Sequence, residues 1–167
     1  MTYVIRIAIV ALILFFLAAG VSAFSISEIT YTVGDDGNGI VNMQYQLNGT
    51  ETLQYDLITK ALDLKSIGKA ELEKALSREV VVNSITPESV QLTVYDMATV
   101  DQSQITTPSF TYVPVESLVD PNLLWIVQKF DINFIPHVST VVFPDGYKES
   151  FSDAQTIPGI THTVSST

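Results

Sequence analysis

The sequence predicts an α+β fold, in which one or two helices pack on one face of an antiparallel β-sheet. Two segments near the N-terminal end alternate apolar with polar residues, apolar residues then recur at helical spacing between about residues 52 and 78, and alternation returns from residue 80 onward. Strands followed by helices and then by further strands are typical of α+β folds.

The first predicted element is a β-hairpin. Residues 29–33 and 41–47 alternate apolar with polar side chains, and the glycine-rich segment 34–39 lies between them. Glycine and asparagine tolerate the positive φ values that a tight turn needs. We therefore expect two antiparallel strands with one face on the core.

Two helices are predicted next. The apolar residues of the first recur at helical spacing and are Leu53, Leu57, Ile58, Ala61 and Leu62. The second covers about residues 69–78, with Glu71 and Glu73 near its start and Arg78 at its end, as the helix dipole favours. Gly68 marks the break between the two helices.

Strands are predicted again after Glu79. Residues 80–82 and 90–97 form a pair around a turn at 86–89. Prolines interrupt residues 99–122, so we expect an extended connection there with one edge strand at 109–113. Alternation also predicts strands at 130–134, 139–143 and 147–151, and the last two are joined by Pro144-Asp145-Gly146, which suits a type I turn closed by a glycine bulge.

The first 23 residues are typical of an export signal. Arg6 precedes the apolar run 7–19, which is shorter than the roughly 20 residues of a membrane span, and Val21-Ser22-Ala23 approximates a cleavage site. We expect cleavage after Ala23, which leaves residues 24–167 as a single extracytoplasmic domain. The alternative is an uncleaved N-terminal membrane anchor, and both interpretations predict an extracellular or cell-surface location.

The composition excludes several classes of function. The 167 residues include 18 Asp and Glu against 8 Lys and Arg, for a net charge of −10, and contain no cysteine. Such an acidic chain repels phosphate backbones, which argues against nucleic-acid binding. The lack of cysteine excludes disulfides, thiolate metal sites and thiol catalysis. We expect no cofactor, and we expect a protein or glycan of the cell envelope as partner, with the oligomeric state left open and with membrane contact only through residues 1–23.

Two groups of residues are candidate metal sites. The first lies in the glycine-rich loop of the hairpin and consists of Asp35, Asp36 and Asn38. Its spacing does not match an EF-type calcium loop, so turn chemistry is the favoured interpretation. The second would need both imidazoles and a carboxylate to converge on zinc, and it consists of His137, His162, Asp145 and Glu149. We expect a structural or surface role for each histidine, with His162 on the polar face of a terminal strand.

No catalytic constellation stands out in the sequence. There is no G-x-S-x-G elbow, and the spacing of the acidic residues singles out no carboxylate pair. The aromatic residues of the C-terminal half are Phe110, Tyr112, Trp125, Phe130, Phe134, Phe143, Tyr147 and Phe151, and alternation assigns most of them to the core rather than to a binding platform. Trp125 is the expected exception, because it lies beside a proline-rich connection. Asn48 begins the sequence Asn48-Gly49-Thr50 and is a candidate glycosylation site.

Two motifs in the C-terminal half carry a resemblance. F-P-D-G-Y at 143–147 continues to Glu149 and Phe151, and I-P-x-I-x-H follows at 157–162. Together with the hairpin from Asp36 to residue 47 and with segment 75–82, they resemble an uncharacterised family of exported archaeal (methanogen or haloarchaeal) proteins. The resemblance covers nearly all of residues 24–167. It implies a cell-surface setting and no particular chemistry, and it directs attention to Asp145 and His162.

The sequence therefore favours an exported domain that acts by binding or assembly rather than by catalysis. Two alternatives stay open. One is a small metal-dependent hydrolase that uses His137, His162 and nearby carboxylates. The other is a filament or lattice subunit that donates residues 24–33 or 160–166 to the sheet edge of a neighbour.

Overall fold

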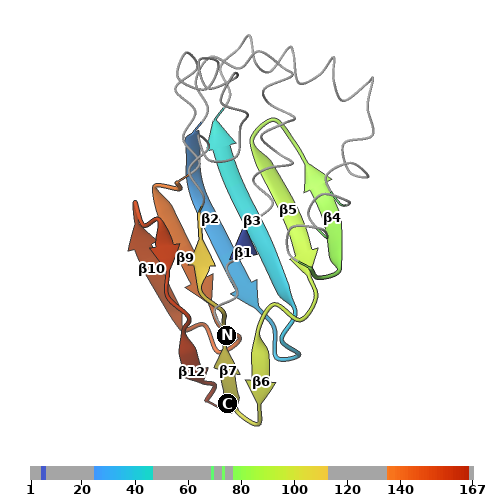
Figure 1. Cartoon of the computed structure of the whole chain (residues 1–167), viewed down its shortest axis with the longest axis vertical. Coiled ribbons are helices and arrows are strands. Elements are labelled where there is room, and N and C mark those ends of the chain that lie inside the picture. Colours follow the sequence, from blue (N-terminus) through green and yellow to red (C-terminus); the bar gives the residue numbers. More distant parts are fainter. Residues whose placement is uncertain are drawn as a thin grey trace.

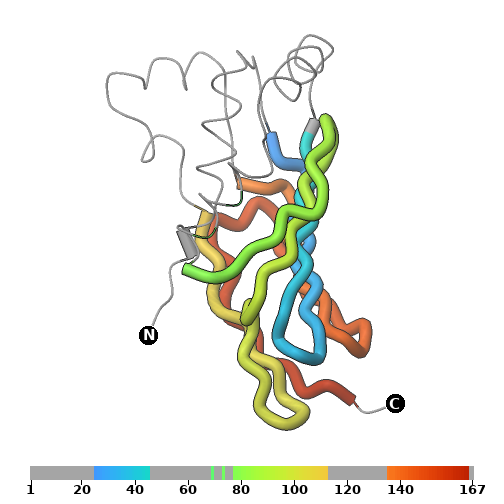
Figure 2. The backbone as a smooth tube through the Cα atoms, turned by 90° about the vertical axis from the view of Figure 1, so that its right-hand side faces the viewer, coloured from blue at the N-terminus to red at the C-terminus, as the bar shows by residue number. Residues whose placement is uncertain are grey.

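The described residues are almost entirely strand and turn. The computed structural model describes residues 5–6, 25–46, 69, 73, 77–112 and 135–165, and this part is 57% strand and 2% helix. The prediction of an α+β fold is therefore wrong. The face of the sheet that was expected to carry helices is covered, in the described residues, by a second layer of strands (Figure 2).

The two predicted helices fall mostly outside the described part of the chain. All of the first one lies outside it. Within the second, Lys69 and Glu73 are helical and form an ion pair at 3.5 Å. The Glu73 carboxylate also accepts a hydrogen bond of 3.2 Å from the Val80 amide, at the start of the next strand.

Six strands form the main sheet. They are β2 (Ser25–Val33), β3 (Gly39–Gln46), β4 (Val80–Ile85), β5 (Ser89–Val94), β9 (Val138–Val142) and β10 (Lys148–Ser152). Their order across the sheet is β10-β9-β2-β3-β5-β4 (Figure 1). Neighbours are antiparallel except β2 and β9, which are parallel. The predicted hairpins β2–β3 and β9–β10 and the predicted pair β4–β5 are confirmed.

The second layer is a long ribbon of short strands. It contains β6 (Thr99–Asp101), β7 (Gln104–Thr106), β8 (Phe110–Thr111), β11 (Thr156–Ile157) and β12 (Thr161–Thr163). β12 pairs with β7 and β11 pairs with β8, both antiparallel and in the same register, with three residues of each strand between the two paired stretches. A strand was predicted at the position of β8, whereas the hairpin of β6 and β7 was expected to be an extended connection.

The break in this ribbon has a chemical cause. Pro108 and Pro158 lie within it, and proline has no amide hydrogen for a strand ladder. Thr107 bridges the gap with both its backbone and its side chain. Its amide donates to the Ile160 carbonyl at 2.9 Å, and its hydroxyl accepts from the Ile160 amide at 3.0 Å.

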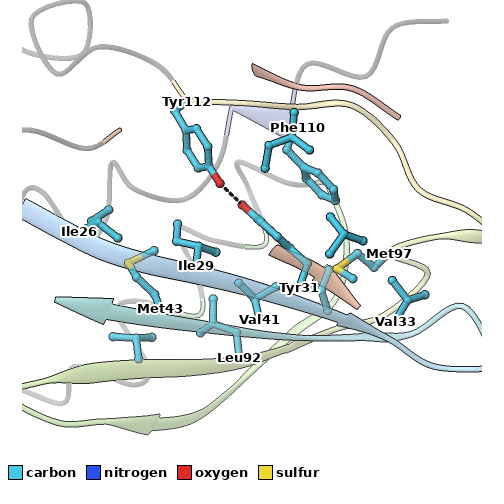
Figure 3. Close-up of a cluster of buried hydrophobic side chains, with 14 of the residues drawn as sticks. Ile26, Ile29, Tyr31, Val33, Val41, Met43, Leu92, Met97, Phe110 and Tyr112 are labelled. Atoms are coloured by element: carbon cyan, nitrogen blue, oxygen red, sulfur yellow. Dashed lines mark hydrogen bonds between the residues drawn. The ribbon is translucent and has the colours of Figure 1, made fainter. Parts of the chain in front are cut away.

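The core lies between the two layers. Alternate residues of β2, β3 and β5 point toward the second layer, as Figure 3 shows for Ile29, Tyr31, Val41, Met43 and Leu92. A bulge in β2 between Ile26 and Glu28 keeps Ile26 on the same side as Ile29. From the second layer, the Phe110 ring stacks on the Tyr31 ring, with centroids 4.4 Å apart. The predicted core positions Phe110, Tyr112 and Phe143 are confirmed as buried, whereas Tyr147, which was assigned to the same group, is 43% exposed.

A chain of hydroxyl groups crosses this core. The Tyr31 hydroxyl lies 2.8 Å from that of Tyr112, which in turn lies 3.0 Å from the Ser139 hydroxyl on β9. Burial is the main cause that raises the pKa of both tyrosines. The hydroxyls therefore stay protonated, and each satisfies another inside the apolar core.

The N-terminal segment contributes one short strand to the described structure. β1 (Ile5–Arg6) pairs in parallel with β8. Residues 7–24 lie outside the described residues, so cleavage after Ala23 stays a prediction. Within the described residues, no helix is long and apolar enough to cross a bilayer.

Candidate functional site

His162 and Asp145, two of the predicted site residues, lie in direct contact. Asp145 is in the turn between β9 and β10, and His162 is in the centre of β12. The His162 Nε2 atom lies 2.8 Å from Asp145 Oδ2, and the two side chains are only 19% and 14% exposed. The contact joins the end of the main sheet to the last strand of the second layer.

Aromatic rings hold the His162 imidazole in place. The Tyr147 ring stacks on it, with centroids 4.2 Å apart and planes 9° from parallel, and the Phe143 ring packs against it at 4.9 Å. His162 shares the side of β12 on which Ile160 and Val164 lie, and all three are at least partly buried. The expectation of His162 on a polar face is therefore wrong, because positions 160, 162 and 164 lie on one side of a strand with a two-residue repeat.

Both oxygens of the Asp145 carboxylate accept hydrogen bonds. Oδ2 accepts from His162 and, at 3.3 Å, from the Ser165 amide, and Oδ1 accepts from the Tyr147 amide at 3.1 Å. The hydrogen bond from His162 is the main cause that lowers the pKa of Asp145. An ionised carboxylate only accepts hydrogen bonds, so the His162 Nε2 atom carries a proton.

Glu149 completes this group through Tyr147. The Tyr147 hydroxyl donates to Glu149 Oε1 at 2.8 Å, and this hydrogen bond is the main cause that raises the pKa of Tyr147. The cluster of Phe143, Asp145, Tyr147, Glu149 and His162 therefore joins the β9–β10 turn to β12, and the Asp145 carboxylate, the His162 Nε2 atom and the Tyr147 hydroxyl each have a protein partner. Its contacts fasten the C-terminal strand to the end of the main sheet.

The second histidine lies in a different place. His137 precedes β9, and its Nδ1 atom lies 3.1 Å from Asp153 Oδ1 in a pair of which both side chains are mostly exposed. Phe143, which contacts His162, follows the other end of β9, about 20 Å away along the strand. One zinc ion binds its ligands at about 2 Å, so it cannot touch both imidazoles.

Among the residues that the structure describes, no three His, Asp or Glu side chains are grouped closely enough to hold a metal ion. The hydrolase hypothesis therefore has no support in this part of the chain.

The strand-donation hypothesis conflicts with the observed strand pairing. β2 lies in the interior of the main sheet, between β9 and β3, and β12 is paired with β7, so donation of either segment would break existing strand pairs.

The loop at the tip of the first hairpin is a self-contained turn. Both Asp36 oxygens accept hydrogen bonds from Asn38, at 3.0 Å from its amide and at 2.6 Å from its side chain. The Asn38 side-chain oxygen accepts from the Asp96 amide at 3.0 Å, which links the tip to the turn after β5. These contacts support turn chemistry rather than ion binding at Asp35, Asp36 and Asn38.

The outer face of the main sheet is a larger feature that sequence patterns did not reveal. It is the side of the sheet that is turned away from the second layer. Strand register aligns its side chains in three rows. The polar row runs across all six strands and consists of Ser150, Thr140, Thr30, Asn42, Gln91 and Ser84. The branched row lies beside it and consists of Lys148, Val142, Thr32, Ile40, Thr93 and Val81. The third row consists of Ser152, Val138, Glu28, Gln44 and Ser89.

The outer face is electrically neutral in an acidic protein. Of the residues in the three rows, only Glu28 and Lys148 are charged, with opposite sign, whereas the whole chain has a net charge of −10. Ile40 and Val81 are 44% and 36% exposed in the branched row. Alternation within each strand indicates which residues point outward, but only the pairing of the strands aligns them into rows.

Several predictions are not tested by the described residues. Asn48, the candidate glycosylation site, and Trp125, Phe130 and Phe134 lie outside them. The resemblance to exported archaeal proteins also stays a prediction. Comparisons with protein-family models, with curated proteins and with solved structures find no match to this chain.

Proposed function

We propose that this protein is an exported domain that works outside the cytoplasm by binding and assembly rather than by catalysis. The outer face of the main sheet is the observation that carries the proposal. It spans six strands, holds two opposite charges, and exposes Ile40 and Val81 beside a row of hydroxyl and amide groups. Apolar side chains surrounded by neutral polar ones are typical of the surfaces at which proteins associate.

The state of the other polar residues supports the same proposal. The Asp145 carboxylate and the His162 Nε2 atom are engaged with each other, and Asp36 is engaged with Asn38. These contacts hold strands and turns together, so Asp36, Asn38, Asp145 and His162 stabilise the fold. The rows of the outer face, in contrast, contain almost no charged side chains that hold strands or turns together.

An envelope protein is the favoured class of partner. The three rows of the outer face contain no aromatic side chain, and sugar rings bind proteins largely by stacking on aromatic rings. Serine, threonine, asparagine and glutamine side chains offer both donors and acceptors, which suits another polar protein surface. Export is supported by Arg6, by the apolar run 7–19 and by the small residues that end at Ala23.

The proposal is tested on protein extracted gently from the envelope of its own cells. We expect an intact mass that matches a chain beginning at Phe24, and a native complex heavier than that chain, which is itself lighter than the 18.3 kDa of all 167 residues. Val81→Lys should reduce the amount of that complex, because it places a charge in the branched row. Val100→Lys on β6 is the matched control, since Val100 is 38% exposed and belongs to the other layer. An extract that contains only monomer, or a complex that Val81→Lys leaves intact, would contradict the proposal.

A further inference from the structure

The outer face of the main sheet has features that identify its partner more closely. We infer that it binds the outer face of a second copy of this chain, sheet against sheet, to form a reversible dimer. This inference rests on the proposed function and deepens it, because it names the occupant of the same surface. Three properties of the outer face support this inference, namely its charge, its shape and its area.

Charge selects the second copy. Two chains of net charge −10 repel each other, and a net charge of this size keeps most protein surfaces apart. Repulsion is weakest where both surfaces are neutral, and the outer face carries only Glu28 and Lys148. A basic partner would find a single acidic side chain here, Glu28, and more counter-charges at acidic loops such as the one with Asp35 and Asp36.

Shape also favours packing of one sheet on another. The branched row presents short β-branched side chains on neighbouring strands, which are Val142, Thr32, Ile40, Thr93 and Val81. Such side chains interdigitate well when two sheets stack about 10 Å apart. In the polar row beside them, the Thr140 and Ser150 hydroxyls already pair with each other, and the Thr30 hydroxyl donates to Glu28. Asn42, Gln91 and Ser84 carry amide and hydroxyl groups that both donate and accept, so this part of the row can pair with its copy.

The area of the outer face is sufficient for a weak dimer. Six strands about 4.8 Å apart and three rows about 7 Å apart cover roughly 29 Å by 20 Å. Two such surfaces bury on the order of 1,000 Å², which is the lower end of the range for specific interfaces. We therefore expect a dimer that dissociates on dilution rather than a permanent one.

Sedimentation equilibrium of the purified protein, in the form in which its cells hold it, tests this inference. We expect a monomer–dimer equilibrium for the unaltered chain. Val81→Lys should raise the dissociation constant at least about tenfold, because in each chain a lysine replaces a short β-branched side chain of the branched row and its ammonium group would have to lose water in the packed interface. Val100→Lys adds the same charge to β6 and should change the constant less than about twofold.

A second pair of variants tests whether weaker dimerisation results from loss of the fold. Asn42→Asp introduces a charge in the centre of the polar row with almost no change of shape, and its neighbours across the strands, Thr30 and Gln91, are uncharged. It should weaken the dimer while the urea midpoint of the isolated chain stays close to that of the unaltered protein. Gln104→Glu on the exposed part of β7 is its control.

Site-specific cross-linking adds an independent measurement. The chain contains no cysteine, so a single introduced thiol reports on one position. A short bismaleimide should link two chains through Asn42→Cys and should leave Gln104→Cys unlinked. Linkage at both positions or at neither would overturn the inference.

The two proposals fail in different ways. If the purified chain is monomeric at every concentration, or if its dimer is unaffected by Val81→Lys and Asn42→Asp, the homotypic inference is overturned. If the envelope extract then still holds a larger complex that Val81→Lys reduces, the proposed binding function stands and another molecule occupies the outer face. If the extract holds only monomer as well, both are overturned.

Discussion

The Tyr31 hydroxyl on β2 lies 2.8 Å from the Tyr112 hydroxyl, which follows β8. This contact joins the middle of the main sheet to the second layer, and the dashed line in Figure 3 marks it. Interdigitated apolar side chains already resist sliding of the layers, and a buried hydroxyl pair adds a further constraint because it is satisfied in only one arrangement. The contact therefore helps to select one packing of the two layers.

Tyr112→Phe should destabilise the protein more than Tyr31→Phe. The Tyr112 hydroxyl contacts both Tyr31 and Ser139, so its removal leaves two buried hydroxyls without their partner, whereas Tyr31→Phe leaves Tyr112 bonded to Ser139. We expect a loss of about 2–3 kcal/mol in the free energy of unfolding for Tyr112→Phe and about 1 kcal/mol for Tyr31→Phe. Urea unfolding measures both. Equal losses would mean that the three hydroxyls do not act as a chain.

Thr107→Val tests the proline break in the second layer. Valine keeps the shape of threonine but cannot accept the hydrogen bond from the Ile160 amide, which is then left without this partner two residues after Pro158. We expect a loss of about 1–3 kcal/mol. Thr106→Val is the control, because the Thr106 hydroxyl meets that of Thr161 at the exposed surface and its loss should cost under about 0.5 kcal/mol.

Alanine substitutions at two glycines with positive φ distinguish the cost of backbone strain from the cost of a steric clash. Gly37 has φ 79° and Gly146 has φ 84°. A Cβ atom at Gly37 would lie 2.6 Å from the Ala98 carbonyl oxygen, whereas one at Gly146 would have nothing within 4 Å. Gly146→Ala should cost about 1 kcal/mol from backbone conformation alone, and Gly37→Ala should cost clearly more. Thermal unfolding measures the difference, and a smaller loss at Gly37 would show that the hairpin tip can move away from Ala98.

Asp145→Asn should change the acid stability of the protein. The pKa of Asp145 is lowered in the folded state, so its contribution is complete above the ordinary aspartate pKa of about 3.9 and is lost as the pH falls through the lowered value. The variant should be less stable than the unaltered chain at neutral pH, and the difference should begin to shrink below about pH 4 and disappear only below the lowered pKa. Urea unfolding at several pH values measures this.

Asp153→Asn is the control for the acid experiment. Asp153 pairs with His137 at the surface, where side chains are 73% and 62% exposed and ion pairs contribute little. We expect its free energy of unfolding to follow that of the unaltered chain at every pH. If both variants behave alike, burial of the Asp145–His162 pair has no energetic effect.

Local sequence predicted the long strands well. β2 and β3, β4 and β5, and β9 and β10 each show alternation over several residues, and glycine or proline marks the turns between them. These strands could be predicted because the apolar side of each one is visible in its own short stretch of sequence. Gly146 adopts the positive φ that its place in the predicted turn requires.

The second layer was not predicted because its strands are too short to show a period. β6, β7, β11 and β12 have two or three residues each. They are strands because distant segments pair in register, as Ile157 does with Phe110. The helical spacing before residue 80 therefore led to a prediction of helices on a face that this ribbon covers.

The sequence by itself determined which residues form the main strands, which side of each strand is apolar, and that Asp145 and His162 were worth attention. Only the tertiary structure decided that these two residues meet, that His137 lies elsewhere, and that neutral side chains align across six strands into the outer face. The physical reason is that alternation specifies the side of a strand but not its neighbour. Neighbours are chosen by long-range packing and hydrogen bonding, which no short stretch of sequence contains.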